Sequence, residues 1–335
     1  MEKIIKYRLA ILIGSIFFLA GLTIGLGYNY LSKNDTGKVI REHSSEFKFI
    51  DPLLLTSVGG EENLGEYKNI KKVVDNQLNE FKSEGKLNDA PVYFKDLKTD
   101  NWFGINVDAK YSPASMLKVA VLLSYLRASE SNPSLLDQNV YVAKDGVDAS
   151  EDQNYKPEHP VQVGRTYNAR QLLWLMIVES DNNAMSLLEQ LIGQDQVNKI
   201  YKDLLITEDA QAGDINDLDF MSPRQYSRFF RLLYNSTYLS HRASEEALQL
   251  LSKTTFTKGL VAGVPNDVVV SHKFGERKII NGSGDKSSII YELHDCGIIY
   301  APTHPYLLCI MTRGESFADL EKVISSISKT VWDLK

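Results

Sequence analysis

The sequence YSPASMLKVAVLLSYL, residues 111–126, predicts a helix that is apolar on nearly every side. Ser112 is a favourable N-cap, and Pro113 suits the first helical position. Ser115 and Lys118 stand three residues apart, so their side chains lie on the same face of this helix. Because burial disfavours the charged form of an amine, we expect Lys118 to have a lowered pKa and to take a proton from a neighbouring hydroxyl.

A capped core helix without a catalytic function is the alternative interpretation, because Ser-x-x-Lys is a weak pattern. The chain contains it five times, beginning at Ser45, Ser83, Ser115, Ser283 and Ser326. Only the copy at Ser115 opens an apolar helix, whereas the others fall in polar sequence or in the terminal amphipathic helix. A catalytic pair at Ser115 and Lys118 therefore needs support from the rest of the chain.

The composition of the 335 residues is that of an ordinary globular protein, with 43% hydrophobic and 24% charged residues. A net charge of −6 without a Lys/Arg-rich run argues against a nucleic-acid partner. The six His show no HExxH spacing and the two Cys cannot form a zinc cluster alone. The sequence therefore predicts no metal and no cofactor, and no feature indicates an oligomeric state.

The amino-terminal segment differs in composition from the rest. Residues 9–31 carry no charge and follow three basic residues, which favours a single-pass membrane helix with its amino end in the cytoplasm. A cleaved signal peptide is the competing interpretation, although no small-x-small cleavage site follows a short apolar region. We therefore predict a cell-membrane anchor at residues 1–31, a polar linker at 32–50 and an extracytoplasmic catalytic domain at 51–335.

Cys296 and Cys309 flank the segment GIIYAPTHPYLL, which reads as a β-hairpin with its turn near Pro302. The two thiols can then face each other across paired strands, and an extracytoplasmic location permits a disulfide. Two buried free thiols are an equal alternative, because a disulfide across directly paired strands demands particular geometry.

The order of the predicted elements indicates an α+β fold. A helix at 66–85 is followed by two strands, then by residues 168–251, which show only helical periods. Three strands and a last amphipathic helix close the chain. We predict a five-stranded antiparallel sheet, assembled from both ends of the chain and flanked by helices, plus an all-helical lobe. The predicted strands are APVYFKDL (90–97), NWFGINVD (101–108), DVVVSHKFGE (267–276), LHDCGIIYA (293–301) and PYLLCIMTRG (305–314).

Two further motifs follow Ser115 in the chain. Ser180-Asp181-Asn182 occurs once, at a break between two apolar helical stretches, where Asp181 or a neighbour can cap the second helix. A simple helix–helix turn is its alternative explanation. The segment HKFGE then places Lys273 on a strand, and a lysine that points to solvent is the alternative there.

In this order the three motifs resemble the signature of the serine β-lactamase and penicillin-binding protein superfamily, which is S-x-x-K, S-D-N and K-T-G. The chain looks most like a class A β-lactamase, and the similarity covers residues 51–335. Its matching pieces are SPASMLK, IVESDNNAMSLL, MSPRQYSRFFRLLY, HKFGE and HDCGIIY. The resemblance implies a β-lactamase/transpeptidase-like fold with the site between the sheet and the helical lobe.

The resemblance also implies a role for each matching residue. Ser115 would attack the carbonyl of an amide or lactam, with Lys118 as its proton acceptor or as an electrostatic aid to one. Ser180 would relay a proton to the leaving nitrogen, and Lys273 would attract an anionic substrate and hold Ser180. The remaining positions would bind substrate. Asn182 would use its side chain, and Gly275 would let the substrate approach the main chain closely. The backbone N–H groups of Ser115 and Glu276 would form the oxyanion hole.

Several positions depart from the family pattern. The Glu-x-x-x-Asn that supplies the deacylating base in class A enzymes is missing, and spacing alone does not place any of the available carboxylates against Ser115. Phe274 replaces the hydroxyl residue that bonds a substrate carboxylate, and Cys296 replaces an arginine with the same task. Arg277 and Arg313 are the candidates to compensate. The carboxylates in the segment are Glu208, Asp214, Asp217 and Asp219.

Three functions remain open from the sequence. The first is a membrane-anchored serine hydrolase of the class A β-lactamase type that forms an acyl-enzyme with β-lactams or related amides. The second is a penicillin-binding, D,D-peptidase-like enzyme that acts on peptidoglycan stem peptides and releases β-lactams slowly. The third is a non-catalytic cell-envelope binding module. A transmembrane sensor is disfavoured, because the residues before Leu9 leave no room for a signalling domain.

Overall fold

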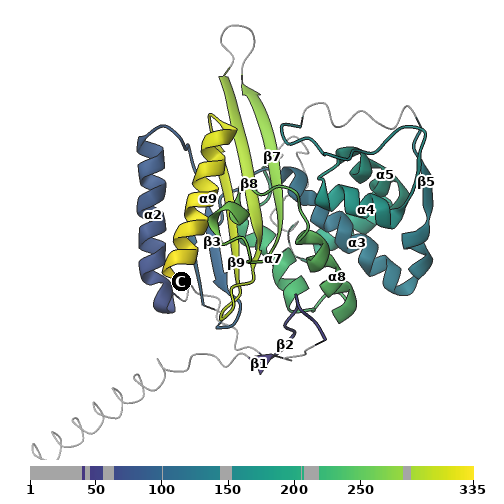
Figure 1. Cartoon of the computed structure of the whole chain (residues 1–335), viewed down its shortest axis with the longest axis horizontal. Coiled ribbons are helices and arrows are strands. Elements are labelled where there is room, and N and C mark those ends of the chain that lie inside the picture. Colours follow the sequence, from purple (N-terminus) through teal and green to yellow (C-terminus); the bar gives the residue numbers. More distant parts are fainter. Residues whose placement is uncertain are drawn as a thin grey trace, which may run out of the picture.

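A five-stranded antiparallel sheet stands between two groups of helices (Figure 1). The computed structural model describes residues 40–41, 46–55, 64–99, 101–143, 153–204, 206, 219–281 and 288–335. Helices α2 and α9 cover one face of the sheet, and the helices of the middle section form a lobe on its other side. The predicted α+β class with a five-stranded antiparallel sheet is confirmed.

The sheet joins strands from both ends of the chain, as the order of elements predicts. Its order is β4-β3-β9-β8-β7, and every neighbouring pair is antiparallel. Strand β7 therefore lies at the edge of the sheet, next to the helical lobe. The bounds are β3 Val92–Asp96, β4 Trp102–Ile105, β7 Val270–Asn281, β8 Ser288–Ile299 and β9 Tyr306–Gly314.

Two amphipathic helices close the outer face of the sheet. α2 spans Lys68–Ser83 after a 3₁₀ turn at Gly65–Tyr67, and α9 spans Phe317–Leu334. Both present an apolar stripe to the sheet, as the helical spacing of their buried residues requires. The buried residues of the two helices are Ile70, Val74, Leu78, Leu320, Val323, Ile324, Ile327, Ser328 and Val331.

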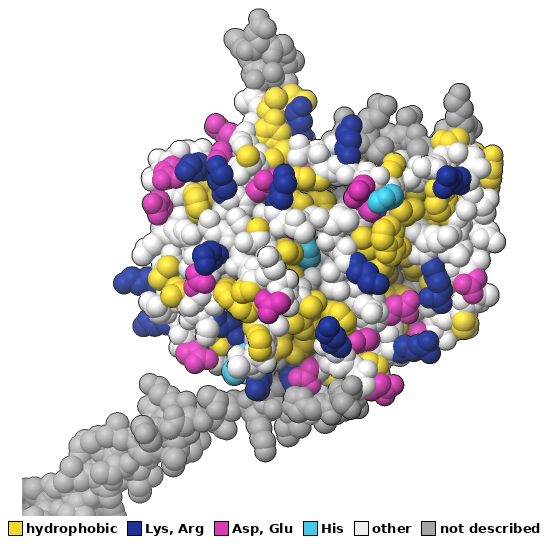
Figure 2. All heavy atoms as spheres, viewed as in Figure 1, with side chains coloured by type: hydrophobic (Ala, Val, Ile, Leu, Met, Phe, Trp, Pro, Cys, Tyr) yellow, Lys and Arg dark blue, Asp and Glu magenta, His cyan; other side chains and the backbone are white. Residues whose placement is uncertain are grey.

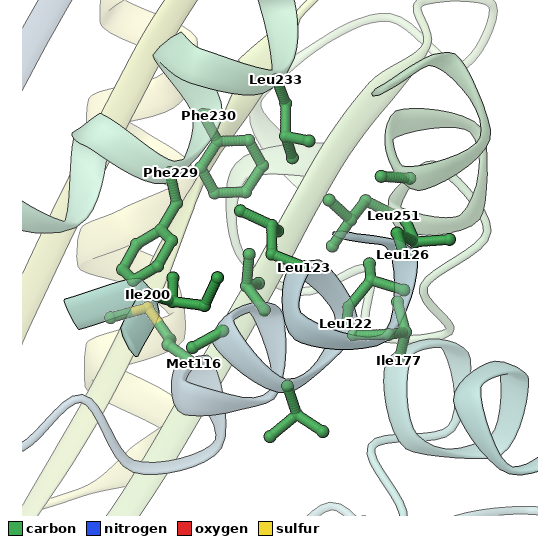
Figure 3. Close-up of a cluster of buried hydrophobic side chains, with 14 of the residues drawn as sticks. Met116, Leu122, Leu123, Leu126, Ile177, Ile200, Phe229, Phe230, Leu233 and Leu251 are labelled. Carbon is green, nitrogen blue, oxygen red and sulfur yellow. The ribbon is translucent and has the colours of Figure 1, made fainter. Parts of the chain in front are cut away.

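The helical lobe is built around α3, Lys118–Ser131, whose first nine residues are all buried. Figure 3 shows Leu122, Leu123 and Leu126 of α3 among side chains of α7, including Phe230. Each fully buried side chain of this size contributes about 1.5–3 kcal/mol, so the core fixes the position of α3. The other helices are α4 Ala169–Val178, α5 Asn182–Ile192, α6 Gln194–Asp203, α7 Pro223–Tyr234 and α8 His241–Leu251, with 3₁₀ turns at Ala114–Leu117, Pro133–Asp137 and Leu260–Gly263.

Two details of the predicted lobe are wrong. The lobe is not purely helical, because Asn139–Tyr141 (β5) pairs with Thr166–Asn168 (β6). The helix after Tyr111 does not begin at Pro113 under a Ser112 cap, since a 3₁₀ turn at Ala114–Leu117 precedes α3 and no side chain caps it. Ala114 has a φ of 47°, and this left-handed conformation is incompatible with a helix that starts at Pro113.

Cys296 and Cys309 form a disulfide between β8 and β9, where the register places them directly opposite each other. This resolves the open alternative between a disulfide and two free thiols. The bond lies in the middle of the sheet and both residues are fully buried.

The segment before the domain is described in part. A short strand β1 at Ile40–Arg41 pairs with β2 at Leu53–Leu55, and the N–H groups of Phe49 and Ile50 donate to the carboxylate of Glu245 on α8. The predicted membrane anchor, residues 1–31, lies outside the described residues. Among the helices that are described, none combines the length and hydropathy needed to cross a bilayer.

Charged side chains are spread over the face of the molecule that Figure 2 draws. On the face drawn in Figure 2, Lys and Arg side chains are interspersed with Asp and Glu side chains. Opposite charges mixed in this way produce only short-range fields at physiological ionic strength.

Candidate active site

Ser115 and Lys118 meet at the start of the central helix of the lobe. Ser115 lies in the 3₁₀ turn and Lys118 is the first residue of α3, and Lys118 Nζ is 2.9 Å from Ser115 Oγ. Lys118 is fully buried, whereas Ser115 is half-buried. The predicted pair is therefore in hydrogen-bond contact, with its serine accessible and its amine shielded from water.

Side chains from distant elements hold the turn that carries Ser115. The Tyr226 hydroxyl of α7 donates to the Met116 carbonyl at 2.9 Å. His294 of β8 lies under the same turn: its Nδ1 accepts from the Thr312 N–H, so its Nε2 carries the proton and donates to the Ser112 carbonyl at 3.0 Å. Full burial lowers the pKa of His294 to about 4, which keeps this neutral form in place.

Ser180-Asp181-Asn182 approaches Lys118 from the break between α4 and α5. Lys118 Nζ lies 2.7 Å from the Ser180 carbonyl, 2.6 Å from Asn182 Oδ1 and 3.2 Å from Ser180 Oγ. A neutral amine has two N–H donors and one lone pair. The two shortest contacts are to acceptor oxygens and use both donors, which leaves the lone pair for the hydroxyl of Ser115.

The loop at Ser180 is held in a strained conformation. Ser180 has a φ of 57°, a value that costs a non-glycine residue about 1–3 kcal/mol. Asp181 offsets this conformational cost at Ser180, because its buried carboxylate accepts from the N–H of Ala184 at 2.9 Å and from the N–H of Val161 at 2.7 Å. Asp181 is thus the cap of α5, as the sequence predicts.

Lys273 reaches the same point from the edge of the sheet. Its Nζ lies 2.9 Å from Ser180 Oγ and 3.1 Å from the Phe274 carbonyl, and its side chain is fully buried. The Ser180 hydroxyl therefore stands between two amines, Lys118 and Lys273. The alternative of a solvent-facing strand lysine is wrong.

Both lysines have a lowered pKa. Burial is the main cause for each, and it brings the pKa of Lys118 to about 7 against the opposing effect of Asp181, Glu276 and Glu189. For Lys273 the pKa is held well below its ordinary value, by burial first and then by the charge of Lys118. At neutral pH Lys118 is thus present in both protonation states and can accept or return a proton.

Gly275 and Glu276 bring strand β7 against the turn of Ser115. A Cβ on Gly275 would stand 2.6 Å from the Pro113 carbonyl, so only glycine permits this approach. The Glu276 side chain is half-buried, and its Oε1 accepts from the Tyr155 N–H at 2.9 Å. Burial raises the pKa of Glu276, and the N–H groups of Tyr155 and Asn154 oppose that effect.

Sequence reasoning missed the residues that close the site from the loop before α4. Gln153 donates from Nε2 to the Ser180 carbonyl at 3.1 Å, and the Tyr155 hydroxyl donates to Glu321 of α9 at 2.6 Å. These contacts join segments more than twenty residues apart, and no local motif marks either residue.

The candidates for carboxylate binding and deacylation that the structure describes are paired with other side chains. Asp219 pairs with Arg277 at 2.8 Å and with Arg313 at 2.7 Å, and both arginines also pair with Glu292. Glu208, Asp214 and Asp217 lie outside the described residues. Within the described part of the chain, no carboxylate is hydrogen-bonded to Ser115, and no cluster of three His, Cys, Asp or Glu could hold a metal ion.

Comparison with known proteins agrees with this geometry. The model of the β-lactamase enzyme family matches residues 69–334. The chain belongs to the β-lactamase enzyme family. Its resemblance to class A β-lactamase-like serine hydrolases is thereby confirmed, and with it the prediction that the protein is an enzyme.

Individual members of the family are distant in sequence. A β-lactamase from Proteus vulgaris is 24% identical over 271 residues, which cover 76% of this chain and 93% of that protein. The solved structure of PBP-A superposes with a TM-score of 0.65 at 18% identity, covering 83% of this chain and 98% of that one. A PBP-A mutant solved as an acyl-enzyme complex with penicillin G gives a TM-score of 0.62 at 18% identity, over 78% and 96% of the two chains.

Proposed function

We propose that this protein is a membrane-anchored, extracytoplasmic serine hydrolase that forms an acyl-enzyme through Ser115 with β-lactams or related amides. The observation that carries the proposal is the contact of the buried Lys118 Nζ with Ser115 Oγ, Ser180 and Asn182. Membership of the β-lactamase enzyme family and the penicillin G complex of the PBP-A mutant support β-lactams as acyl donors.

The reaction follows from the positions of the polar atoms. Neutral Lys118 takes the hydroxyl proton while Ser115 Oγ forms a bond to the carbonyl carbon, and the backbone N–H groups of Ser115 and Glu276 bind the oxyanion. The C–N bond then breaks, and Ser180 gives its proton to the leaving nitrogen. Lys273 or Lys118 replaces that proton, since both amines contact Ser180 Oγ. Water finally hydrolyses the ester.

A penicillin-binding, D,D-peptidase-like enzyme is the second candidate function. It is favoured because the segment before α7 lacks the Glu-x-x-x-Asn pattern that supplies the deacylating base in class A enzymes and because Asp219 is paired with two arginines. A serine ester without a base to activate water is long-lived, so such a protein acts on peptidoglycan stem peptides and is inhibited by β-lactams.

The lifetime of the adduct distinguishes the two candidates. The full chain is mixed with a fluorescent penicillin, free drug is removed, and the adduct is followed by intact mass spectrometry beside a Ser115→Ala control. Loss of the adduct within seconds, with release of hydrolysed drug, supports the β-lactamase. An adduct that persists for hours supports the penicillin-binding enzyme.

The membrane location has its own support and its own test. Residues 9–31 form an uncharged apolar stretch after basic residues, which favours a single membrane-spanning helix. We expect the full chain to stay in the membrane fraction after alkaline carbonate washing, and a chain that starts at residue 46 to be released. Release of both would exclude the anchor.

A further inference from the structure

A cavity of about 240 Å³ lies beside Lys273, because the Phe274 ring that lines it is centred 4.2 Å from Lys273 Nζ. Its lining includes Glu179, which precedes Ser180, and Phe274, which follows Lys273. Because Ser180 faces the leaving nitrogen of the substrate, groups attached to that nitrogen extend toward this cavity. We refer to it below as the leaving-group cavity.

The floor of the leaving-group cavity is aromatic. The rings of Phe256 and Phe274 are stacked at 4.3 Å between centroids, and the Tyr155 ring meets them edge-on at 4.9 Å and 5.6 Å. Both phenylalanines are buried. Such a floor gives favourable contact to a flat apolar group and offers no hydrogen-bond donor to a carboxylate.

The cations of the cavity lining are matched in number by carboxylates, and the pKa of Lys273, whose Nζ lies 4.2 Å from the centre of the Phe274 ring, is held well below its ordinary value by burial. Its rim carries two lysines and two glutamates, so the rim has no net charge. Lys258 is further engaged by Glu321 at 3.2 Å, and Arg277 and Arg313 are paired with Asp219 and Glu292. The rim residues are Lys156, Glu158, Glu179 and Lys258.

Glu276 adds a negative group on the same side of strand β7. It lies two residues after Phe274, so both side chains leave the strand on one face. Its Oε1 is held by the Tyr155 N–H, whereas its Oε2 is buried and has no hydrogen-bond partner in the described structure. A substrate carboxylate at this position would meet the carboxylate of Glu276.

We propose that the leaving-group side of this site selects an uncharged, apolar group, and that Glu276 and Phe274 together disfavour a carboxylate there. The inference rests on the proposed function, because it takes Ser115 as the nucleophile and Ser180 as the residue that faces the leaving nitrogen. The substrate class it defines is an amide or lactam whose leaving-group side carries an amide, an ester or an aromatic substituent in place of a free acid.

Benzylpenicillin and its methyl ester test this inference, because they differ only in that carboxylate. The rate of adduct formation at Ser115 is measured on the full chain by intact mass spectrometry, and each rate is divided by the rate at which hydroxide opens the same probe. We expect the ester to react about tenfold faster or more, since two like charges separated by several ångströms at a protein surface correspond to about that factor.

Variants of Glu276 and Phe274 show whether these two residues cause the preference for the ester over the free acid. Glu276→Gln keeps the shape and removes the charge, so it should lower the ratio of the ester rate to the benzylpenicillin rate about tenfold. The ratio is the readout, because Glu276 also acts on the pKa of Lys118 and the loss of its charge changes both rates together. Phe274→Thr supplies a hydroxyl and should act in the same direction. Glu315→Gln removes the same charge from an exposed residue just after β9 and should change neither rate.

The outcomes separate the two proposals. A wild-type protein that reacts faster with the free acid, or a preference that neither Glu276→Gln nor Phe274→Thr reduces, would overturn the selectivity while leaving Ser115 as nucleophile. No adduct with either probe in the wild type or in any variant would refute the proposed function and the inference with it.

Discussion

The protonation of Lys118 should set the pH dependence of acylation. Its pKa of about 7 lies more than three units below the ordinary value of 10.5, chiefly because the amine is fully buried. In the proposed mechanism the neutral amine is the proton acceptor, so the rate should rise with pH. With a midpoint of about 7, roughly 9% of the sites are reactive at pH 6 and roughly 91% at pH 8, which is about a tenfold increase in rate.

Single-turnover acylation by a fluorescent penicillin between pH 5.5 and pH 9 measures this directly. Lys118→Met should slow the reaction about 100-fold or more, as expected for the loss of a general base. Lys278→Met changes an exposed lysine of β7 and serves as the control, with the midpoint unchanged. A rate that does not vary between pH 6 and pH 8, or a Lys118→Met variant that keeps the wild-type profile, would refute the assignment of Lys118 as proton acceptor.

Three further predictions concern residues that hold the candidate site in place. Gly275→Ala puts a Cβ 2.6 Å from the Pro113 carbonyl, so we expect about 1–3 kcal/mol less stability in urea unfolding and at least about tenfold slower acylation. Wild-type values for both would contradict the close approach of β7 to the turn that carries Ser115. Asp181→Ala removes the cap of α5 and leaves a buried N–H without its acceptor, so urea unfolding should show a loss of about 2 kcal/mol or more in stability. Asp181→Asn keeps a capping oxygen and should lose less stability. Equal losses in the two variants would argue against the capping role. His294 has a pKa of about 4 in the fold and about 6.5 when unfolded, so only the unfolded chain takes up its proton as the pH falls through 6.5. The unfolding free energy should therefore fall by about 2 kcal/mol more between pH 7 and pH 4.5 in the wild type than in His294→Gln. Parallel curves for the two proteins would show that His294 is not held neutral.

The strands and helices could be predicted because their patterns are local. The apolar spacing of α2 follows the helical period of 3.6 residues, and β3 and the three closing strands are short runs rich in β-branched and aromatic residues; all of these elements are present. The start of α3 could not be predicted in this way. Its 3₁₀ turn depends on the left-handed Ala114 and on the hydrogen bond from His294, which is far away in the sequence.

The site was predictable to the extent that it is built from motifs. The structure brings together Ser115, Lys118, Ser180, Asn182 and Lys273, although no two of the three motifs are neighbours in the chain. The side-chain environment was not predictable, because it depends on tertiary pairing. Sequence offered Arg277 and Arg313 as carboxylate ligands, and only coordinates show that both are engaged by Asp219 and Glu292.

The chemical identity of the nucleophile is the central claim, and peptide mapping tests it most directly. The full chain is treated with a penicillin, digested, and analysed for the peptide that carries the mass of the opened drug. We predict one modified residue, Ser115, and no modification in Ser115→Ala. A drug adduct on any other residue, or an unmodified chain after prolonged exposure, would contradict the account.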